Sequence, residues 1–308
     1  TMPFLTLFRP FKNSSAFEYS PSLKKIAALI SSPSIVFADK TPSLYSEPCD
    51  DNGISVVFLK EQKEITTFKP KTKEDWNAKA KDMDSRIHQS IYNEEFLSRV
   101  DTKGCESLLD VGCGPGNLAL RFAKKLEKVY AMDYSEEMLR CVNENAASKK
   151  INNIETIQAS WEDDWNRLPS VDIVVASRSM EVADMEGALK KLSNKAKQKV
   201  YLTYKVGGSF VDTEILEAMG RRIHPKPDYI YIVNILYKMG INPKIDYIES
   251  ENKKINWNDF EGFRESTFWS IGEMSDGEIE GLKKLFFDEN FRKKPQKPTY
   301  WAMISWNV

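Results

Sequence analysis

The spacing of apolar and polar positions becomes regular at about Cys105. From there, short apolar runs alternate with stretches whose apolar residues recur at helical spacing. Apolar strands that alternate with amphipathic helices are typical of a parallel sheet covered on both faces. The expected strands are Ser107–Val111, Val129–Asp133, Ile154–Gln158, Val171–Ser177 and Lys199–Tyr204, and the expected helices are Asn117–Leu126, Glu136–Ala147 and Met185–Leu192.

The pattern is looser after Tyr204. About fifty residues separate the last two expected strands, and a connection of that length commonly carries function. The expected elements are a helix from about Asp228 to Met239, a strand Lys244–Glu249, a helix from the Ser275/Glu278 capping box to about Asp288, and an aromatic strand Tyr300–Trp306.

The segment before Thr72 differs from the rest, because it is rich in Pro, Ser and Phe. We expect residues 1–71 to form a small N-terminal α/β appendage, and an ordered arm over the main domain is the alternative. Thr72 and Asp75 form a capping box that begins one long helix, from Lys73 to about Val100. Expected within the appendage are a helix Ser22–Ile30 and strands Ser34–Ala38, Ile54–Lys60 and Glu64–Phe68.

Composition narrows the function classes. Hydrophobic residues make up 41% of the 308 residues, which is ordinary for a globular protein. The 44 basic and 45 acidic residues leave a net charge of −1, so binding of nucleic acid mainly through phosphates loses support. The four cysteines have no CxxC spacing, which argues against a zinc site, and we expect no bound metal. No apolar run reaches the roughly 18–20 residues that cross a bilayer, and we expect a reduced, cytoplasmic protein without a membrane partner.

The strongest chemical signal is LDVGCGPGN at residues 109–117, where the first expected strand meets a helix. Glycines at every second position let the backbone turn sharply and bring N–H groups close to a ligand. A dinucleotide fingerprint would place its third glycine where Asn117 stands. The segment instead resembles motif I of the class I S-adenosylmethionine-dependent methyltransferases. The residues that carry this resemblance are Asp110, Gly112, Gly114 and Gly116.

This resemblance implies a doubly wound, Rossmann-like α/β sheet of seven strands whose last strand, Tyr300–Trp306, is antiparallel. It also implies S-adenosylmethionine as the methyl donor and S-adenosylhomocysteine as the product. The methyltransferase domain would be residues 72–308. Its parts would be a cap helix at 72–104, a donor-binding core at 105–205, and acceptor-side elements with the terminal strands at 206–308.

The resemblance also assigns donor contacts at the ends of the strands. Asp133, followed by Tyr134, would accept both ribose hydroxyls at the tip of the second strand. The position of the family's adenine-binding acid holds Ser160, a departure, so Glu162 or Asp163 would substitute for it. Further expected donor contacts are Trp161 against the adenine face, Ser177 and Arg178 near the methionine moiety, and Trp76 and Arg86 on the cap helix.

The acceptor side carries fewer signals. An activated methyl group needs mainly alignment, so the sequence does not require a general base. His224 and Tyr229 are the candidates for that role, with packing of tyrosines in the core as the alternative. For Arg86 the alternative is a surface ion pair. Several lysines, among them Lys190 and Lys191, are the basis for an RNA acceptor.

The sequence therefore predicts an S-adenosylmethionine-dependent methyltransferase that acts on a small molecule. Two alternatives stay open, namely methylation of RNA or protein, and a non-catalytic module that binds S-adenosylmethionine or S-adenosylhomocysteine. The identity of the acceptor and the oligomeric state do not follow from the sequence.

Overall fold

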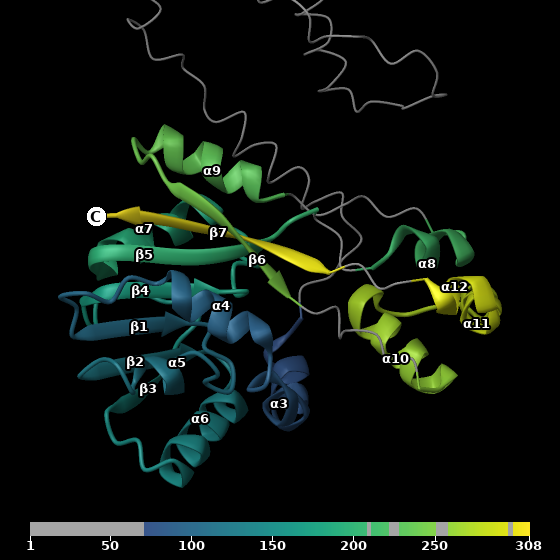
Figure 1. The fold of residues 1–308 in the computed structure, drawn as a ribbon, viewed down its shortest axis with the longest axis horizontal. Coiled ribbons are helices and arrows are strands. Elements are labelled where there is room, and N and C mark those ends of the chain that lie inside the picture. The colour runs from purple at the N-terminus through teal and green to yellow at the C-terminus, as the bar shows by residue number, and fades with distance from the viewer. Residues whose placement is uncertain (1–70, 208–210, 222–227, 251–257, 295–297) are drawn as a thin grey trace, which may run out of the picture. The chain divides into compact units, whose positions relative to one another are not determined.

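The computed structural model describes residues 71–207, 211–221, 228–250, 258–294 and 298–308. Within them, seven strands form one sheet in the order β3-β2-β1-β4-β5-β7-β6 (Figure 1). Neighbouring strands from β1 to β5 are parallel, whereas β7 is antiparallel to both β5 and β6. This is the Rossmann-like sheet that the sequence predicts. The strands are β1 (Ser107–Val111), β2 (Lys128–Asp133), β3 (Ile154–Gln158), β4 (Val171–Ser177), β5 (Ala196–Lys205), β6 (Lys244–Ser250) and β7 (Thr299–Asn307).

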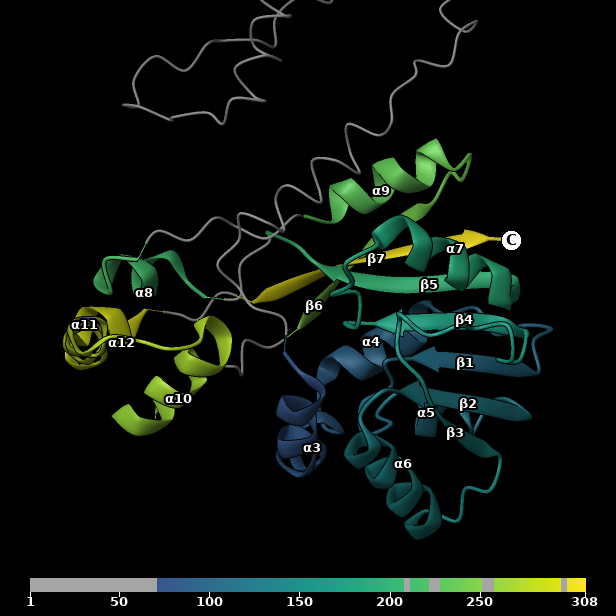
Figure 2. The ribbon, with the colours of Figure 1, turned by 180° about the vertical axis from the view of Figure 1, so that it is seen from behind.

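Helices cover both faces of the sheet, because the central strands present apolar residues on both faces. In β1, Leu108 packs with the buried residues of one face and Leu109 with those of the other. The first face is covered by α4 (Ile91–Arg99), α5 (Ala119–Phe122) and α6 (Glu136–Ser148) (Figure 1), and the second by α7 (Met185–Lys195) and α9 (Tyr229–Lys238) (Figure 2). No helix among the described residues is long and apolar enough to span a membrane.

The long helix expected from Lys73 to about Val100 is wrong in one respect, because it is divided into α3 (Lys73–Ile87) and α4. The Asn93 side-chain amide donates to the carbonyl of Ile87 over 2.8 Å and closes the end of α3. Ser90 then caps α4 by accepting from the amide of Tyr92. The expected capping box of Thr72 and Asp75 is present.

Four helices that lie between β5 and β7 in the sequence pack around an apolar cluster of their own. They are α8 (Thr213–Ala218), α10 (Phe260–Ile271), α11 (Asp276–Phe287) and α12 (Glu289–Lys293), and we call them the α8/α10–α12 group. The predicted capping box of Ser275 and Glu278 begins α11. Arg221 pairs with both carboxylate oxygens of Glu278 and donates to the carbonyls of Ile271 and Glu273, so one guanidinium joins three segments of the group.

Some expected features lie outside the described residues. They are the helix and the three strands of the N-terminal appendage, and His224.

Candidate active site

The loop that follows β1 turns back on itself through left-handed glycines. Gly112, Gly114 and Gly116 have φ values of 68°, 54° and 85°, in the region that only glycine adopts readily. The amides of Gly112 and Cys113 both donate to the carbonyl of Met132, which fixes the loop against β2. A side chain at Gly112 would lie only 2.4 Å from Ser179 Cβ, whereas the space beside Gly114 is open to 4.0 Å.

Asp133 links this loop to the tip of β2. One of its carboxylate oxygens accepts from the amide of Gly114 over 2.9 Å, and the other accepts from the amide of Ser135 over 3.0 Å. The side chain is buried, and burial raises its pKa although these amides stabilise the charged form. Asp133 thus presents carboxylate oxygens in a dry environment, at the loop that the sequence singles out.

Asp110 is a second buried carboxyl group beneath the loop. Burial is the main reason that its pKa rises to about 7, and the nearby charge of Asp133 adds to this effect. The Arg178 guanidinium and the amide of Ala119 act in the opposite direction. Negative charge on Asp110 and Asp133 lowers the electrostatic potential beneath the loop, which favours a cationic ligand bound above the loop.

The loop after β3 lies against the same edge of the sheet. The Trp161 indole donates to the carbonyl of Ser179 over 3.1 Å, and the Ser179 hydroxyl donates to the carbonyl of Val111. Glu162 is exposed, and its charge contributes to the pKa of Tyr134, which burial raises to about 12. Trp161 is thus bonded to the segment after β4, and Glu162 lies near enough to Tyr134, the neighbour of Asp133, to influence its pKa.

The tip of β4 contains a cluster that sequence reasoning recognised only in part. Ser177 and Arg178 were expected here, but Tyr92 and Thr203 were not. The Tyr92 hydroxyl lies 2.7 Å from both the Ser177 and the Thr203 hydroxyls. The Arg178 guanidinium stacks over the Tyr92 ring at 4.1 Å, and its backbone has a left-handed φ of 58°. Since 111 residues separate Tyr92 from Thr203, no local pattern could have revealed this cluster.

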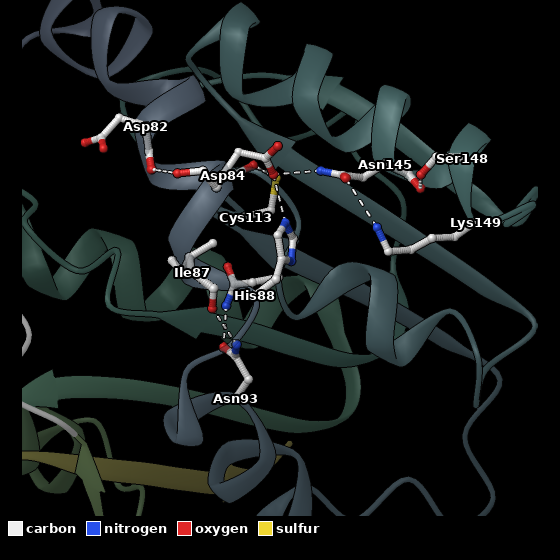
Figure 3. A network of polar contacts seen from close by, with 12 residues as sticks. Asp82, Asp84, Ile87, His88, Asn93, Cys113, Asn145, Ser148 and Lys149 are labelled. Atoms are coloured by element: carbon white, nitrogen blue, oxygen red, sulfur yellow. Dashed lines mark hydrogen bonds and ion pairs between the residues drawn. The ribbon is translucent and has the colours of Figure 1, made fainter.

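The cap formed by α3 is fixed to the core by a polar network (Figure 3). Asp84 accepts from His88 Nε2 over 2.8 Å and from the Asn145 amide on α6 over 2.7 Å. The Asn117 side chain at the end of the motif donates to Asn93 on α4 over 2.7 Å. These contacts attach the segment before β1 to the end of the motif loop and to α6.

Comparison with known proteins identifies the family. A model of the methyltransferase domain matches residues 108–199. An uncharacterised protein of Haemophilus influenzae is 36% identical over 239 residues, which are 76% of this chain and 88% of that protein. The chain belongs to the class I S-adenosylmethionine-dependent methyltransferases. S-adenosylmethionine is therefore its cofactor and methyl transfer its activity.

Two relatives of this methyltransferase with named functions differ in what they methylate. The trans-aconitate 2-methyltransferase of Mycolicibacterium gilvum is 28% identical over 38% of this chain and 44% of its own length. The ribosomal protein L11 methyltransferase of Campylobacter lari is 34% identical over 49% of this chain and 50% of its own length. The chain thus spans half of these two relatives or less, and their acceptors do not identify its own.

Three further site candidates of this methyltransferase have partners within the protein, namely the expected donor contacts Arg86 and Trp76 and the candidate general base Tyr229. Arg86 is exposed and forms two hydrogen bonds with the Asp82 carboxylate, one turn earlier in α3. Trp76 meets the Trp269 ring of α10 edge-on, with the ring centroids 5.6 Å apart. The Tyr229 hydroxyl lies 2.6 Å from that of Tyr247 on β6, and this contact raises the pKa of Tyr229 to about 12.

Proposed function

We propose that this protein transfers the methyl group of S-adenosylmethionine to a small-molecule acceptor. The bound donor supplies an electrophilic methyl group, so the main task of the chain is to hold the donor and the acceptor in line. Asp133 would accept the ribose hydroxyls, and the Gly112–Gly116 loop would approach the donor backbone-first. The observation that carries this assignment is the Asp133 carboxylate, buried and bonded to the Gly114 amide over 2.9 Å.

We assign the other donor contacts by their positions at the strand ends around Asp133. Trp161, Glu162 and Tyr134 would bind the adenosine part, because they lie on the β3 side of Asp133. The tip of β4 would face the methionine end of the donor, because β4 is beside β1 on the side away from β2. Arg86 and Trp76 would reach the donor only by leaving Asp82 and Trp269.

Three of the lysines on which the RNA alternative rests have partners within the protein, which favours a small acceptor. Lys190 pairs with Glu186, and the Lys191 ammonium donates to the carbonyls of Trp161 and Asp163. Lys195 donates in the same way to the carbonyl of Leu168. Cations engaged within the protein contribute little to a phosphate-binding surface.

The contact between α3 and α10 also supports a small acceptor. Trp76 and Trp269 meet, and the ammonium groups of Lys71 and Lys79 lie 4.7 and 5.5 Å from the Trp269 ring centroid. The segment before the core and the α8/α10–α12 group thus touch, and a polymer would need these elements to separate. The trans-aconitate relative provides a small acid as a precedent within the matched region.

Calorimetric titration with S-adenosylhomocysteine tests the donor site. We expect one-to-one binding that Asp133→Ala weakens at least about tenfold, because the ribose loses a charged hydrogen-bond acceptor. Asp172→Ala is the matched control, since this carboxylate also accepts from two backbone amides, those of Glu106 and Ser107, but lies at the opposite end of the parallel strands. Equal affinity of wild type and Asp133→Ala would remove Asp133 from the donor site.

Labelled methyl transfer tests the acceptor class. The protein is incubated with tritiated S-adenosylmethionine and, separately, with the small-molecule, RNA and protein fractions of one bacterial extract. We expect label in a small-molecule product. Label confined to RNA or protein would refute a small acceptor while leaving the methyltransferase assignment intact.

A further inference from the structure

The hydrogen bonds between the hydroxyl groups at the tip of β4 can be followed from donor to acceptor. The amide of Arg178 donates to Thr203 Oγ1 over 3.0 Å. Thr203 is fully buried, and among the described residues its hydroxyl has one further partner, the Tyr92 hydroxyl at 2.7 Å. A hydroxyl has a single hydrogen to donate, and an amide nitrogen does not accept it. In the arrangement that leaves no buried hydroxyl hydrogen without an acceptor, Thr203 donates to the Tyr92 oxygen.

The direction continues to the end of the chain of hydroxyls. Since the Tyr92 oxygen accepts from Thr203, the Tyr92 hydrogen goes to Ser177 Oγ, 2.7 Å away. Burial raises the pKa of Tyr92, so its phenol keeps this hydrogen at neutral pH. Ser177 is half-buried and comes last, so its own hydrogen is directed away from the cluster.

This chain of hydroxyls can donate a hydrogen bond but cannot take up a proton. Its members are Thr203, Tyr92 and Ser177, and no carboxylate or imidazole is bonded to any of them in the described structure. The adjacent Arg178 is permanently cationic. Its guanidinium is stacked on Tyr92, and the Thr203 hydroxyl holds its left-handed backbone. A strained non-glycine residue that is held in this way commonly marks a functional position.

A hydroxyl donor next to a guanidinium recognises a negatively charged oxygen. Arginine matches the two oxygens of a carboxylate in particular. The strand order β2-β1-β4 puts this pair across the motif I loop from Asp133, away from the ribose side of the pocket. An anionic group bound here would therefore lie beyond the donor's adenosine.

We propose that Ser177 and Arg178 form a subsite for a carboxylate of the methyl acceptor, with Tyr92 as the positioning residue that orients both. The inference rests on the proposed function, because it names the class of small molecule that is methylated. Tyr92 precedes the matched methyltransferase domain, so the α4 segment contributes to specificity from outside the donor-binding core.

The donor has a carboxylate of its own, and the test separates the two sources. S-adenosylhomocysteine has the same carboxylate as S-adenosylmethionine, so its affinity reports any contact with the donor. The protein saturated with S-adenosylhomocysteine is then titrated calorimetrically with acetate, benzoate, succinate and citrate, and with the corresponding amides. The variants are Ser177→Ala, Arg178→Gln and Tyr92→Phe.

The matched control is Tyr201→Phe. Tyr201 is also a buried tyrosine, but it lies on β5, and its hydroxyl accepts from the amide of Asp101, after α4, instead of from the cluster. Thr203→Val is a second way to break the chain of hydroxyls, should Tyr92→Phe fail to fold.

We expect at least one acid to bind about tenfold or more tightly than its amide, as is typical of a charged hydrogen-bonded pair. Ser177→Ala and Arg178→Gln should remove this preference, and Tyr92→Phe or Thr203→Val should reduce it about threefold or more. The affinity for S-adenosylhomocysteine should stay within about twofold in every variant, and Tyr201→Phe should match wild type throughout.

Three results would overturn the proposal. They are the absence of any preference for acids in the wild type, an unchanged preference in Arg178→Gln, and a loss of S-adenosylhomocysteine affinity in Ser177→Ala or Arg178→Gln, which would assign the subsite to the donor. A wild type that fails to bind S-adenosylhomocysteine at all would instead refute the donor site proposed above.

Discussion

Gly112 and Gly114 have the same left-handed backbone but different surroundings. An added methyl group would collide with Ser179 at Gly112 and would meet nothing nearer than the end of Met83 at Gly114. We expect Gly112→Ala to lower the free energy of unfolding by about 2–4 kcal/mol, and Gly114→Ala by about 1–2 kcal/mol from backbone strain alone. Urea unfolding of both variants measures the difference. Equal losses would mean that Ser179 moves aside without cost.

The two carboxyl groups under the loop make stability depend on pH. The pKa of Asp110 is about 7 in the folded protein, against an ordinary value of 3.8. A raised pKa stabilises the fold below the ordinary value, and this contribution is lost as the pH rises through about 7. We expect urea unfolding between pH 4.5 and 8 to show this loss, and Asp110→Asn to flatten it.

The control for this pH dependence is Asp172→Asn. The Asp172 carboxylate accepts from the amides of Glu106 and Ser107, and these bonds lower its pKa. Because its stabilising contribution is complete above its ordinary pKa, this substitution should leave the slope between pH 5 and 8 unchanged. A wild-type slope in Asp110→Asn would contradict the role assigned to Asp110.

At the residue scale, the sequence indicated which polar residues lie close together where those residues follow a recognisable strand. The glycines of motif I and Asp133 lie at strand ends that the apolar pattern itself defines, so the structure brings them together. Tyr92 and Thr203 escaped notice, because a tyrosine in a helix and a threonine in a strand carry no local sign of a shared hydrogen bond. The ion pair of Arg86 with Asp82 was the alternative considered from the sequence.

At the scale of the elements, one ion pair dominates the α8/α10–α12 group. Arg221 lowers the pKa of Glu278 to about 2, so the pair stabilises the group above the ordinary pKa of Glu278. This stabilisation is lost as the pH falls from about 4.5 to 2. We expect Glu278→Gln to weaken the group by about 1–2 kcal/mol, after screening by solvent.

Amide hydrogen exchange measures this effect directly. The amides of α11 should exchange faster in Glu278→Gln while those of β1 keep their protection. Glu289→Gln breaks a much more exposed pair with Lys293, and we expect a change below about 0.5 kcal/mol. Faster exchange in β1 as well would mean that the group and the sheet unfold together.

The predicted helices and strands were accurate where the periodicity of apolar residues was strong. The strands and helices between β1 and β5 were expected near their observed positions, although α5 is only a short helix, Ala119–Phe122. The break between α3 and α4 was missed, because it depends on the tertiary contact of Asn93 with Ile87. The helices α8 and α10 were also missed, because glycine, proline and charged residues interrupt the apolar pattern there.

For the molecule as a whole, sequence predicts the sheet better than the acceptor. Parallel strands bury continuous runs of apolar residues, and such runs can be recognised in the sequence. The contacts to which we assign the acceptor side join distant segments, namely Trp76 with Trp269 and Tyr92 with Ser177. Such pairings follow from packing and not from periodicity.

The place of β7 in the sheet has a consequence for biosynthesis. β7 follows β6 along the chain, yet it lies between β5 and β6 in the sheet and pairs with both. During translation, the strands β1 to β5 can associate as they emerge, whereas β6 must wait for the ribosome to deliver its neighbour. Trp301 of β7 also lies edge-on to Tyr92, with the ring centroids 6.0 Å apart. The parallel strands can therefore associate before the surroundings of Tyr92 are completed, because that step requires β7.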